Sequence, residues 1–324
     1  MFRHALLISV ALVCATVAPA IAKGMLFELP LVSGSTETVA FGINDSGTVT
    51  GLYLDSNGVE HGFVGPDNGS NYSSFDDSTA PDTQGRGISP DGHITGIANA
   101  LSGDASTYIP FERTPKGAIT DVTRNGMTLN YLIQGINSKD IFTGNYENSS
   151  LQYIGHVGKN AKYASSIKLN GIDNTGVAGR DIDDAGDIVG WYLDAGGNEH
   201  GFLLSRGKAT TIDHPGGATT LEGINNKGTI SGLYTDTSGN RHGFTYDIKT
   251  RKFHEIAVPG STFVEVWGLN DQGLVALDGE NSDGVFVGYI YCPSSKNCPT
   301  AVAANHPRLP VLHHIVPHLP LLTP

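Results

Sequence analysis

Six side chains suited to holding a polar ligand recur along this 324-residue chain at intervals of 42 to 48 residues. Each stands two residues before a recurring Ile or Leu, and the six are Phe41, Arg86, Gln134, Arg180, Glu222 and Trp267. Arg86 and Arg180 could hold a carboxylate through paired N–H donors, and Trp267 or Phe41 could stack on a sugar ring. We predict that the six bind a small acidic or sugar-like ligand. The alternative is sequence drift at a solvent-facing rim.

Three carboxylates in or beside this set are candidates for acid–base catalysis. Glu222 could carry a proton, and Asp181 and Glu265 stand next to the set. Hydrolysis of a glycosidic bond commonly needs two carboxylates placed across that bond. The chain contains no Gly-x-Ser-x-Gly nucleophile motif, no His-Glu-x-x-His zinc motif and no phosphate-binding glycine loop. A glycoside hydrolase or polysaccharide lyase is therefore the alternative to a binding protein.

An internal repeat must position these side chains. The clearest copies are GINDSGTVTGLYLDSNGVEHGF from Gly42, IDDAGDIVGWYLDAGGNEHGF from Ile182 and GINNKGTISGLYTDTSGNRHGF from Gly223. Weaker copies begin at Gly87, Gly135 and Gly268. Each unit reads as four short strands, which in the fifth copy are predicted over residues 221–225, 229–235, 241–247 and 253–258. Four antiparallel strands with a period of 40–50 residues are typical of a β-propeller blade.

The two ends of the repeat array complement each other. The sixth unit stops after its third strand, at residues 285–291, and residues 27–32 resemble the fourth-strand segment 255–259. Pairing the two ends closes a ring and removes exposed sheet edges. We predict an all-β, six-bladed β-propeller of four-stranded antiparallel blades over residues 23–298, closed by the N-terminal strand. We expect its ligand pocket on the face of the loops that join each fourth strand to the next first strand. An open array is the alternative.

The motifs Gly-Ile-Asn-Asp-x-Gly, Gly-x-Tyr-x-Asp and His-Gly-Phe resemble the HAF-type extracellular repeat of exported bacterial proteins. The resemblance covers roughly residues 26–292 in six copies, three of them close, and copies two, three and six lack His-Gly-Phe. It implies export and a propeller-like fold. It implies no reaction, so the function must be argued from the residues.

Residues shared between copies are expected to build the unit. One repeat position carries His61, His200 and His242, for which we predict a local structural role. One turn of the same three copies begins at Asp55, Asp194 and Asp236. Its alternating oxygen atoms suit calcium, but Asp, Asn, Ser and Gly are also what hairpin turns require. We expect no metal and no cofactor, with calcium as the alternative.

The two ends of the chain differ from the repeats. Residues 1–22 read as a signal peptide, with a short basic start, an apolar run and small residues before the cleavage point. An uncleaved anchor is the alternative. Two cysteines follow, Cys292 and Cys298, and we predict a disulfide between them. Residues 299–324 are rich in Pro, His and Leu and predict a disordered tail. A metal site is the alternative for its histidines, which are His306, His313, His314 and His318.

The overall composition limits the partners of the protein. The net charge of −12 gives an acidic surface, which repels the phosphates of nucleic acids. No segment after the leader reads as a membrane span. We predict a secreted monomer, extracellular or periplasmic, that acts as a recognition scaffold for a glycan, a small anionic ligand or a surface protein. The alternatives are the carbohydrate-active enzyme and a structural envelope protein.

Overall fold

The computed structural model describes residues 24–299 except 79, 100–107, 123–128, 262, 281–285 and 295–297. The predicted signal peptide and the tail from residue 300 onward lie outside the described residues. The described part of the chain is built from strands and turns, and it contains no helix long and apolar enough to cross a membrane.

Six four-stranded antiparallel sheets form the blades of a β-propeller, and the prediction of this fold is confirmed. Blade I contains β2 (Glu37–Ile43), β3 (Thr48–Leu54), β4 (Glu60–Pro66) and β5 (Ser73–Phe75). Blade II contains β6 (Gln84–Ile88), β7 (Ile94–Ala98), β8 (Ile109–Arg113) and β9 (Ile119–Asp121). Blade III contains β10 (Leu129–Ile136), β11 (Ile141–Glu147), β12 (Tyr153–Lys159) and β13 (Lys162–Ser166).

The remaining blades follow the same order along the chain. Blade IV contains β14 (Gly176–Ile182), β15 (Ile188–Leu193), β16 (Glu199–Ser205) and β17 (Lys208–Thr211). Blade V contains β18 (Ala218–Ile224), β19 (Thr229–Thr235), β20 (Arg241–Asp247) and β21 (Lys252–Ile256). Blade VI contains β22 (Val264–Leu269), β23 (Val275–Glu280), β24 (Phe286–Cys292) and β1 (Met25–Glu28).

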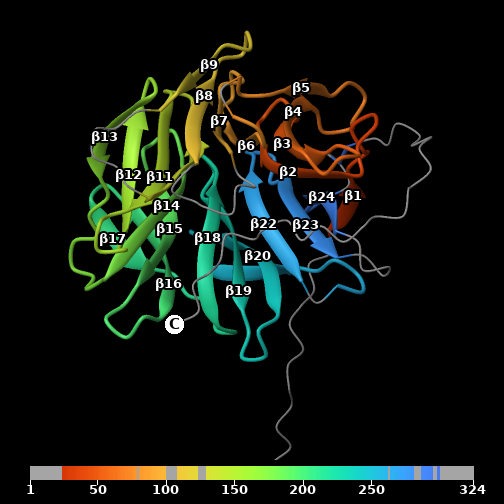
Figure 1. The fold of residues 1–324 in the computed structure, drawn as a ribbon. Coiled ribbons are helices and arrows are strands. Elements are labelled where there is room, and N and C mark those ends of the chain that lie inside the picture. Colours follow the sequence, from red (N-terminus) through yellow and green to blue (C-terminus); the bar gives the residue numbers. More distant parts are fainter. Residues whose placement is uncertain are drawn as a thin grey trace, which may run out of the picture.

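Blade VI closes the ring, because its fourth strand comes from the N-terminal part of the chain. β1 pairs antiparallel with β24, and Figure 1 shows the red β1 beside the blue β24. The closing strand was predicted over residues 27–32 but ends at Glu28. Leu29 still donates a backbone hydrogen bond to Gly288, and Pro30, which has no N–H, cannot continue the ladder.

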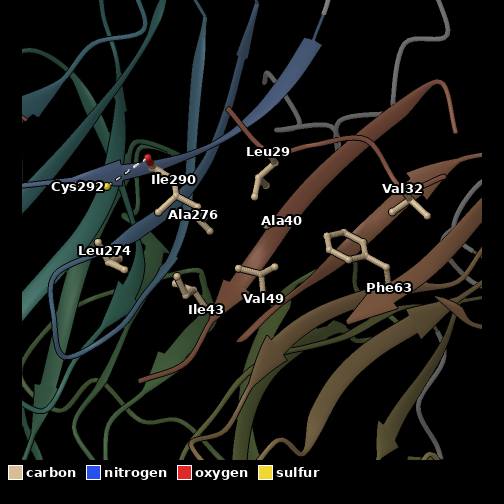
Figure 2. Packing of buried hydrophobic residues seen from close by; sticks show 10 residues of the cluster. All are labelled: Leu29, Val32, Ala40, Ile43, Val49, Phe63, Leu274, Ala276, Ile290 and Cys292. Carbon is tan, nitrogen blue, oxygen red and sulfur yellow. Dashed lines mark hydrogen bonds between the residues drawn. The ribbon is translucent and has the colours of Figure 1, made fainter. Parts of the chain in front are cut away.

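Apolar side chains fill the space between neighbouring blades. Figure 2 shows the cluster between blades VI and I, which consists of Leu29, Val32, Ala40, Ile43, Val49, Phe63, Leu274, Ala276, Ile290 and Cys292. Four blades bury the Phe of one repeat position completely, at Phe63, Phe111, Phe202 and Phe244. The predicted disulfide is confirmed, and it ties Cys298 to the buried Cys292 with 5.5 Å between their Cα atoms.

The Asn of the Gly-Ile-Asn motif links the blades to one another. Asn44 Oδ1 accepts hydrogen bonds from the N–H groups of Ser46 and Thr48, which closes its own turn. Its Nδ2 donates to the carbonyl of Ser89 in the next blade, at 3.1 Å. The same amide-to-carbonyl bond joins Asn137 to Asp183, Asn225 to Asn270, and Asn270 to Asn44. We call this set of four bonds the Asn belt.

The shared histidines have local partners, as expected from their shared position. The His61 ring stacks on Tyr53, and its Nδ1 lies 2.9 Å from Asp76 Oδ1. The His242 ring stacks on Tyr234, and its Nε2 lies 3.0 Å from Asp236 Oδ2 in the adjacent turn. These contacts hold the second and third strands of a blade to the turn between them.

Candidate functional site

The six predicted ligand-binding residues line one cavity, to which the first strand of each blade contributes one side chain. They are Phe41, Arg86, Gln134, Arg180, Glu222 and Trp267. The axial cavity has a volume of about 90 Å³, which corresponds to roughly six to nine ordered water molecules. It is therefore large enough for a small polar group or molecule and too small to enclose a protein loop. The structure brings the six residues together, and their role in binding stays a prediction.

A β-bulge positions each of the six side chains. Phe41 is the extra residue between the pairs Ala40–Gly51 and Gly42–Thr50. The other five first strands show the same two-against-one register at the equivalent place. A bulge bends its strand and changes the direction of a side chain. In blades I to V the residue opposite the bulge is glycine, and a Cβ on Gly51 would lie 1.9 Å from the Val39 carbonyl oxygen. Blade VI has Leu277 at this place.

The cavity opens on the face opposite to the predicted one. Its mouth is lined by the turns between first and second strands, through Asn44, Asp45, Pro90, Asn137, Asp183, Asp184, Asn225, Asn226, Asn270 and Asp271. The pocket was expected on the face of the fourth-to-first-strand loops, and that expectation is wrong. The bulges lie near the end of each first strand, next to these turns, and the Asn belt surrounds the mouth.

One side of the cavity, from blades VI, I and II, is aromatic and cationic. The rings of Phe41 and Trp267 meet edge to face, with 4.8 Å between their centroids. The Arg86 guanidinium carbon lies 4.4 Å from the Phe41 ring centroid and 5.7 Å from that of Trp267, within the range of a cation–π interaction. Trp267 Nε1 donates a hydrogen bond of 2.6 Å to Asp278 Oδ1, which fixes the orientation of the indole.

The other side carries an ion pair. Arg180 Nε lies 3.5 Å from Glu222 Oε2, and both side chains are largely buried. Burial raises the pKa of Glu222, and the positive charge of Arg180 opposes this rise. Gln134 lies between Arg86 and Arg180 in the order of the blades and is 8 % exposed.

Three adjacent blades offer buried donors that lack an aligned hydrogen bond. The buried Arg86 Nε, Gln134 Nε2 and Arg180 Nε make no aligned hydrogen bond with any residue that the structure describes. Burial lowers the pKa of Arg86 to about 10, so this guanidinium remains charged at neutral pH. Buried donors without acceptors destabilise a fold. A ligand that brings acceptor oxygens would remove this cost.

The three candidate carboxylates have different environments. Asp181 lines the cavity beside Glu222, and its oxygens accept hydrogen bonds from the N–H groups of Ile182 and Ile224. Burial raises the pKa of Asp181 to about 7, and the charge of Glu222 adds to this rise. Glu265 is outside the cavity lining and forms a close ion pair with Arg241. Its candidacy as a catalytic residue therefore loses its geometric basis.

Asp278 was missed at the sequence level. Its partner in register is Glu265, and the equivalent residues of most other blades, such as Leu233, are apolar. A carboxylate at an apolar repeat position was therefore an available signal. Burial raises the pKa of Asp278 to about 7. This residue reaches the site through its bond to Trp267.

Comparisons with known proteins agree with the fold. No family model and no curated protein matches this chain. TolB from Acinetobacter baumannii is similar in structure, with a TM-score of 0.53 and 10% identity over 76% of this chain; the chain spans 64% of the length of that protein. A mutant of AofleA from Arthrobotrys oligospora gives a TM-score of 0.50 and 10% identity, over 83% of this chain and 86% of that one. At these identities the likeness shows the fold alone. The HAF-type resemblance stays a prediction.

Proposed function

We propose that this protein is an exported recognition scaffold that binds a small carboxylate in its axial cavity. The observation that carries this proposal is the group of three donor side chains on consecutive blades. Arg86, Gln134 and Arg180 line one cavity, and their buried donors at Nε or Nε2 make no aligned hydrogen bond with a described residue, although Arg180 Nε forms the ion pair with Glu222. Two guanidinium groups favour an anion, and their fork of N–H groups matches a carboxylate.

The aromatic side narrows the class of ligand to acidic sugars and similar cyclic carboxylates. Trp267 is only partly buried and lines the cavity two blades away from Arg180, so it offers a surface for a sugar ring. A carboxylate held by the arginines would place the body of the ligand against Trp267 and Phe41. The cavity is too small to enclose an internal stretch of a glycan, so a glycan would bind through a terminal acidic sugar.

Export is part of the proposal. Its basis is the predicted leader together with the Cys292–Cys298 disulfide, which is compatible with an oxidising compartment. Export can be tested by treating living cells of the source with a protease and by probing the medium and the periplasmic fraction for this protein. Recovery of the protein only from the cytoplasm would contradict export.

A matched ligand panel tests binding. Isothermal titration calorimetry would compare acidic monosaccharides and simple carboxylates with their neutral counterparts. We expect binding of acidic members only, and loss of at least about tenfold in affinity for Arg86→Ala combined with Arg180→Ala, since each charged hydrogen bond contributes about 1.5–3 kcal/mol. Lys208→Ala removes an exposed cation away from the cavity and should bind as the wild type does. Equal binding of neutral ligands, or full affinity in the double variant, would refute the proposal.

A second candidate function rests on the neighbouring carboxylates of Glu222 and Asp181. Both line the cavity, and both have a raised pKa, which is the property of a general acid. Incubation with acidic polysaccharides, followed by assays for reducing ends and unsaturated products, separates an enzyme from a binding protein. Products formed by the wild type and absent with Glu222→Gln would establish catalysis.

A further inference from the structure

A group of three metal-ligand side chains lies outside the axial cavity, across the seam between blades II and III. His93 Nδ1 is 2.9 Å from Asp140 Oδ1 and 3.2 Å from Asp91 Oδ2. One ligand atom from each of the three residues lies within 4.8 Å of the others. Asp91 and His93 belong to the first-to-second-strand turn of blade II, and Asp140 belongs to the equivalent turn of blade III.

The contacts of His93 differ from those of the repeat histidines. His200 also lies between two aspartates, but it uses a different nitrogen for each, with Nδ1 2.8 Å from Asp213 and Nε2 3.5 Å from Asp194. Both carboxylates near His93 face the same nitrogen, Nδ1. One imidazole nitrogen carries at most one proton, so it cannot donate an aligned hydrogen bond to two oxygens.

The alignment of these atoms points to coordination. His93 Nδ1 and Asp140 Oδ1 are buried and 2.9 Å apart, yet neither makes an aligned hydrogen bond with a residue in the described ranges. Ligand atoms around one metal ion at 2.0–2.2 Å lie roughly 3 Å apart, with their lone pairs directed at the ion. The two distances from His93 Nδ1 are therefore compatible with a first coordination shell.

The group lies at a seam between two blades that lacks a bond of the Asn belt. Ser89 stands where four other blades have the Asn of the belt, and its side chain has no amide to donate across the seam from blade II to blade III. Glu112 of blade II crosses the same seam, where its Oε2 accepts a hydrogen bond of 2.7 Å from the Ala161 N–H. Asp91 is 57% exposed, so an ion could reach the group from solvent.

We propose that Asp91, His93 and Asp140 bind one divalent transition-metal ion, which clamps blade II to blade III. One imidazole nitrogen and two carboxylates suit Zn²⁺ or Mn²⁺, whereas calcium sites are built from oxygen ligands alone. Water, or the nearby Glu112, would complete the coordination. The site is separate from the cavity, and it is independent of the proposed function.

Metal binding by the full chain tests this site. Because the tail histidines could also bind zinc, the background protein carries alanine at His306, His313, His314 and His318. Equilibrium dialysis and calorimetry with Zn²⁺ and with Mn²⁺ should give one ion per chain. His93→Ala or Asp140→Asn should weaken binding by more than the roughly 10- to 100-fold that loss of an outer-shell partner causes. Asn tolerates the positive φ of 56° at position 140, so this variant should keep the fold.

A matched control and a second measurement keep the test decisive. His200→Ala removes a histidine with two aspartate neighbours and should leave the ion bound. Saturating metal should raise the midpoint of thermal unfolding of the background protein and leave that of Asp140→Asn unchanged. The proposal would be overturned if the background protein bound no ion, or if His93→Ala and Asp140→Asn bound the ion as tightly as the background protein does. It would also be overturned if His200→Ala weakened binding as much as these two variants do.

Discussion

Asn270 is the residue at which the Asn belt closes the ring. It is 4% exposed, and its Oδ1 accepts hydrogen bonds of 3.0 Å from the N–H groups of Gln272 and Leu274. Its Nδ2 donates to the Asn44 carbonyl at 3.1 Å, which joins blade VI to blade I. Asn270→Ala removes all three bonds, and Asn270→Asp keeps the two acceptor bonds but replaces the donor with an oxygen that faces the Asn44 carbonyl.

The two variants should differ in a calculable way. Each hydrogen bond contributes about 1 kcal/mol, and a buried group left without a partner adds to the loss, so Asn270→Ala should lower the free energy of unfolding by about 3–4 kcal/mol. Asn270→Asp keeps both acceptor bonds and should cost about 1–2 kcal/mol. Blade IV has an aspartate at the equivalent place, Asp183, whose Oδ1 accepts a bond from the Asp187 N–H. The turn therefore tolerates aspartate.

Equilibrium unfolding in urea, followed by circular dichroism, measures both differences. Asn174→Ala is the control, because Asn174 is exposed and donates a single hydrogen bond to the Ile172 carbonyl. It should change the free energy of unfolding by less than about 0.5 kcal/mol. A loss below about 1 kcal/mol for Asn270→Ala, or equal losses for the two Asn270 variants, would refute the role of the belt in closing the ring.

Two further predictions concern buried charge. Burial raises the pKa of Glu37, Glu60 and Asp278 to about 7. The folded protein then holds protons that the unfolded chain releases, so the free energy of unfolding should fall as the pH rises from about 4 to about 7 and level off above it. Urea unfolding at pH 5 and pH 8 measures this difference. Glu60→Gln should make the free energy of unfolding depend less steeply on pH. Greater stability at pH 8 than at pH 5 would contradict the prediction. Glu222→Gln removes the anion 3.5 Å from Arg180 and should raise carboxylate affinity by several-fold in calorimetry, since an opposing ion pair no longer competes; weaker binding would contradict the site.

The sequence predicted the fold well where the repeat motifs define the strands. The predicted ranges 229–235 and 241–247 match β19 and β20, because tight turns with glycine bound β19 on both sides and precede β20. Gly228 has the positive φ, 80°, that such a turn requires. β18 begins three residues before its predicted start, since the first half of each first strand carries no shared motif. Boundaries outside the motifs depend on pairing with neighbouring strands.

The site was predicted in part. Repeat alignment selected the six cavity residues because the bulge recurs at one place in every unit. It could not show which end of the channel they face, since a bulge breaks the alternation from which side-chain direction is inferred. His93 and Asp140 belong to different units and meet only across a seam. Alignment of the repeats matches the same position in each unit, so it does not detect a contact between two different positions of neighbouring units.

The same geometry separates the groups that stabilise the ring from the groups available to a ligand. The blades are joined by the Asn belt and by apolar clusters such as the one in Figure 2. Each bulge directs one side chain toward the axis. Among the six, Arg86, Gln134 and Arg180 have buried donors that no described residue accepts. Substitution of these three side chains should therefore change the ligand that is bound and leave the closure of the ring intact. In five of the six blades, glycine opposite the bulge, as at Gly51, allows the second strand to approach the first strand closely, because a Cβ there would meet a first-strand carbonyl.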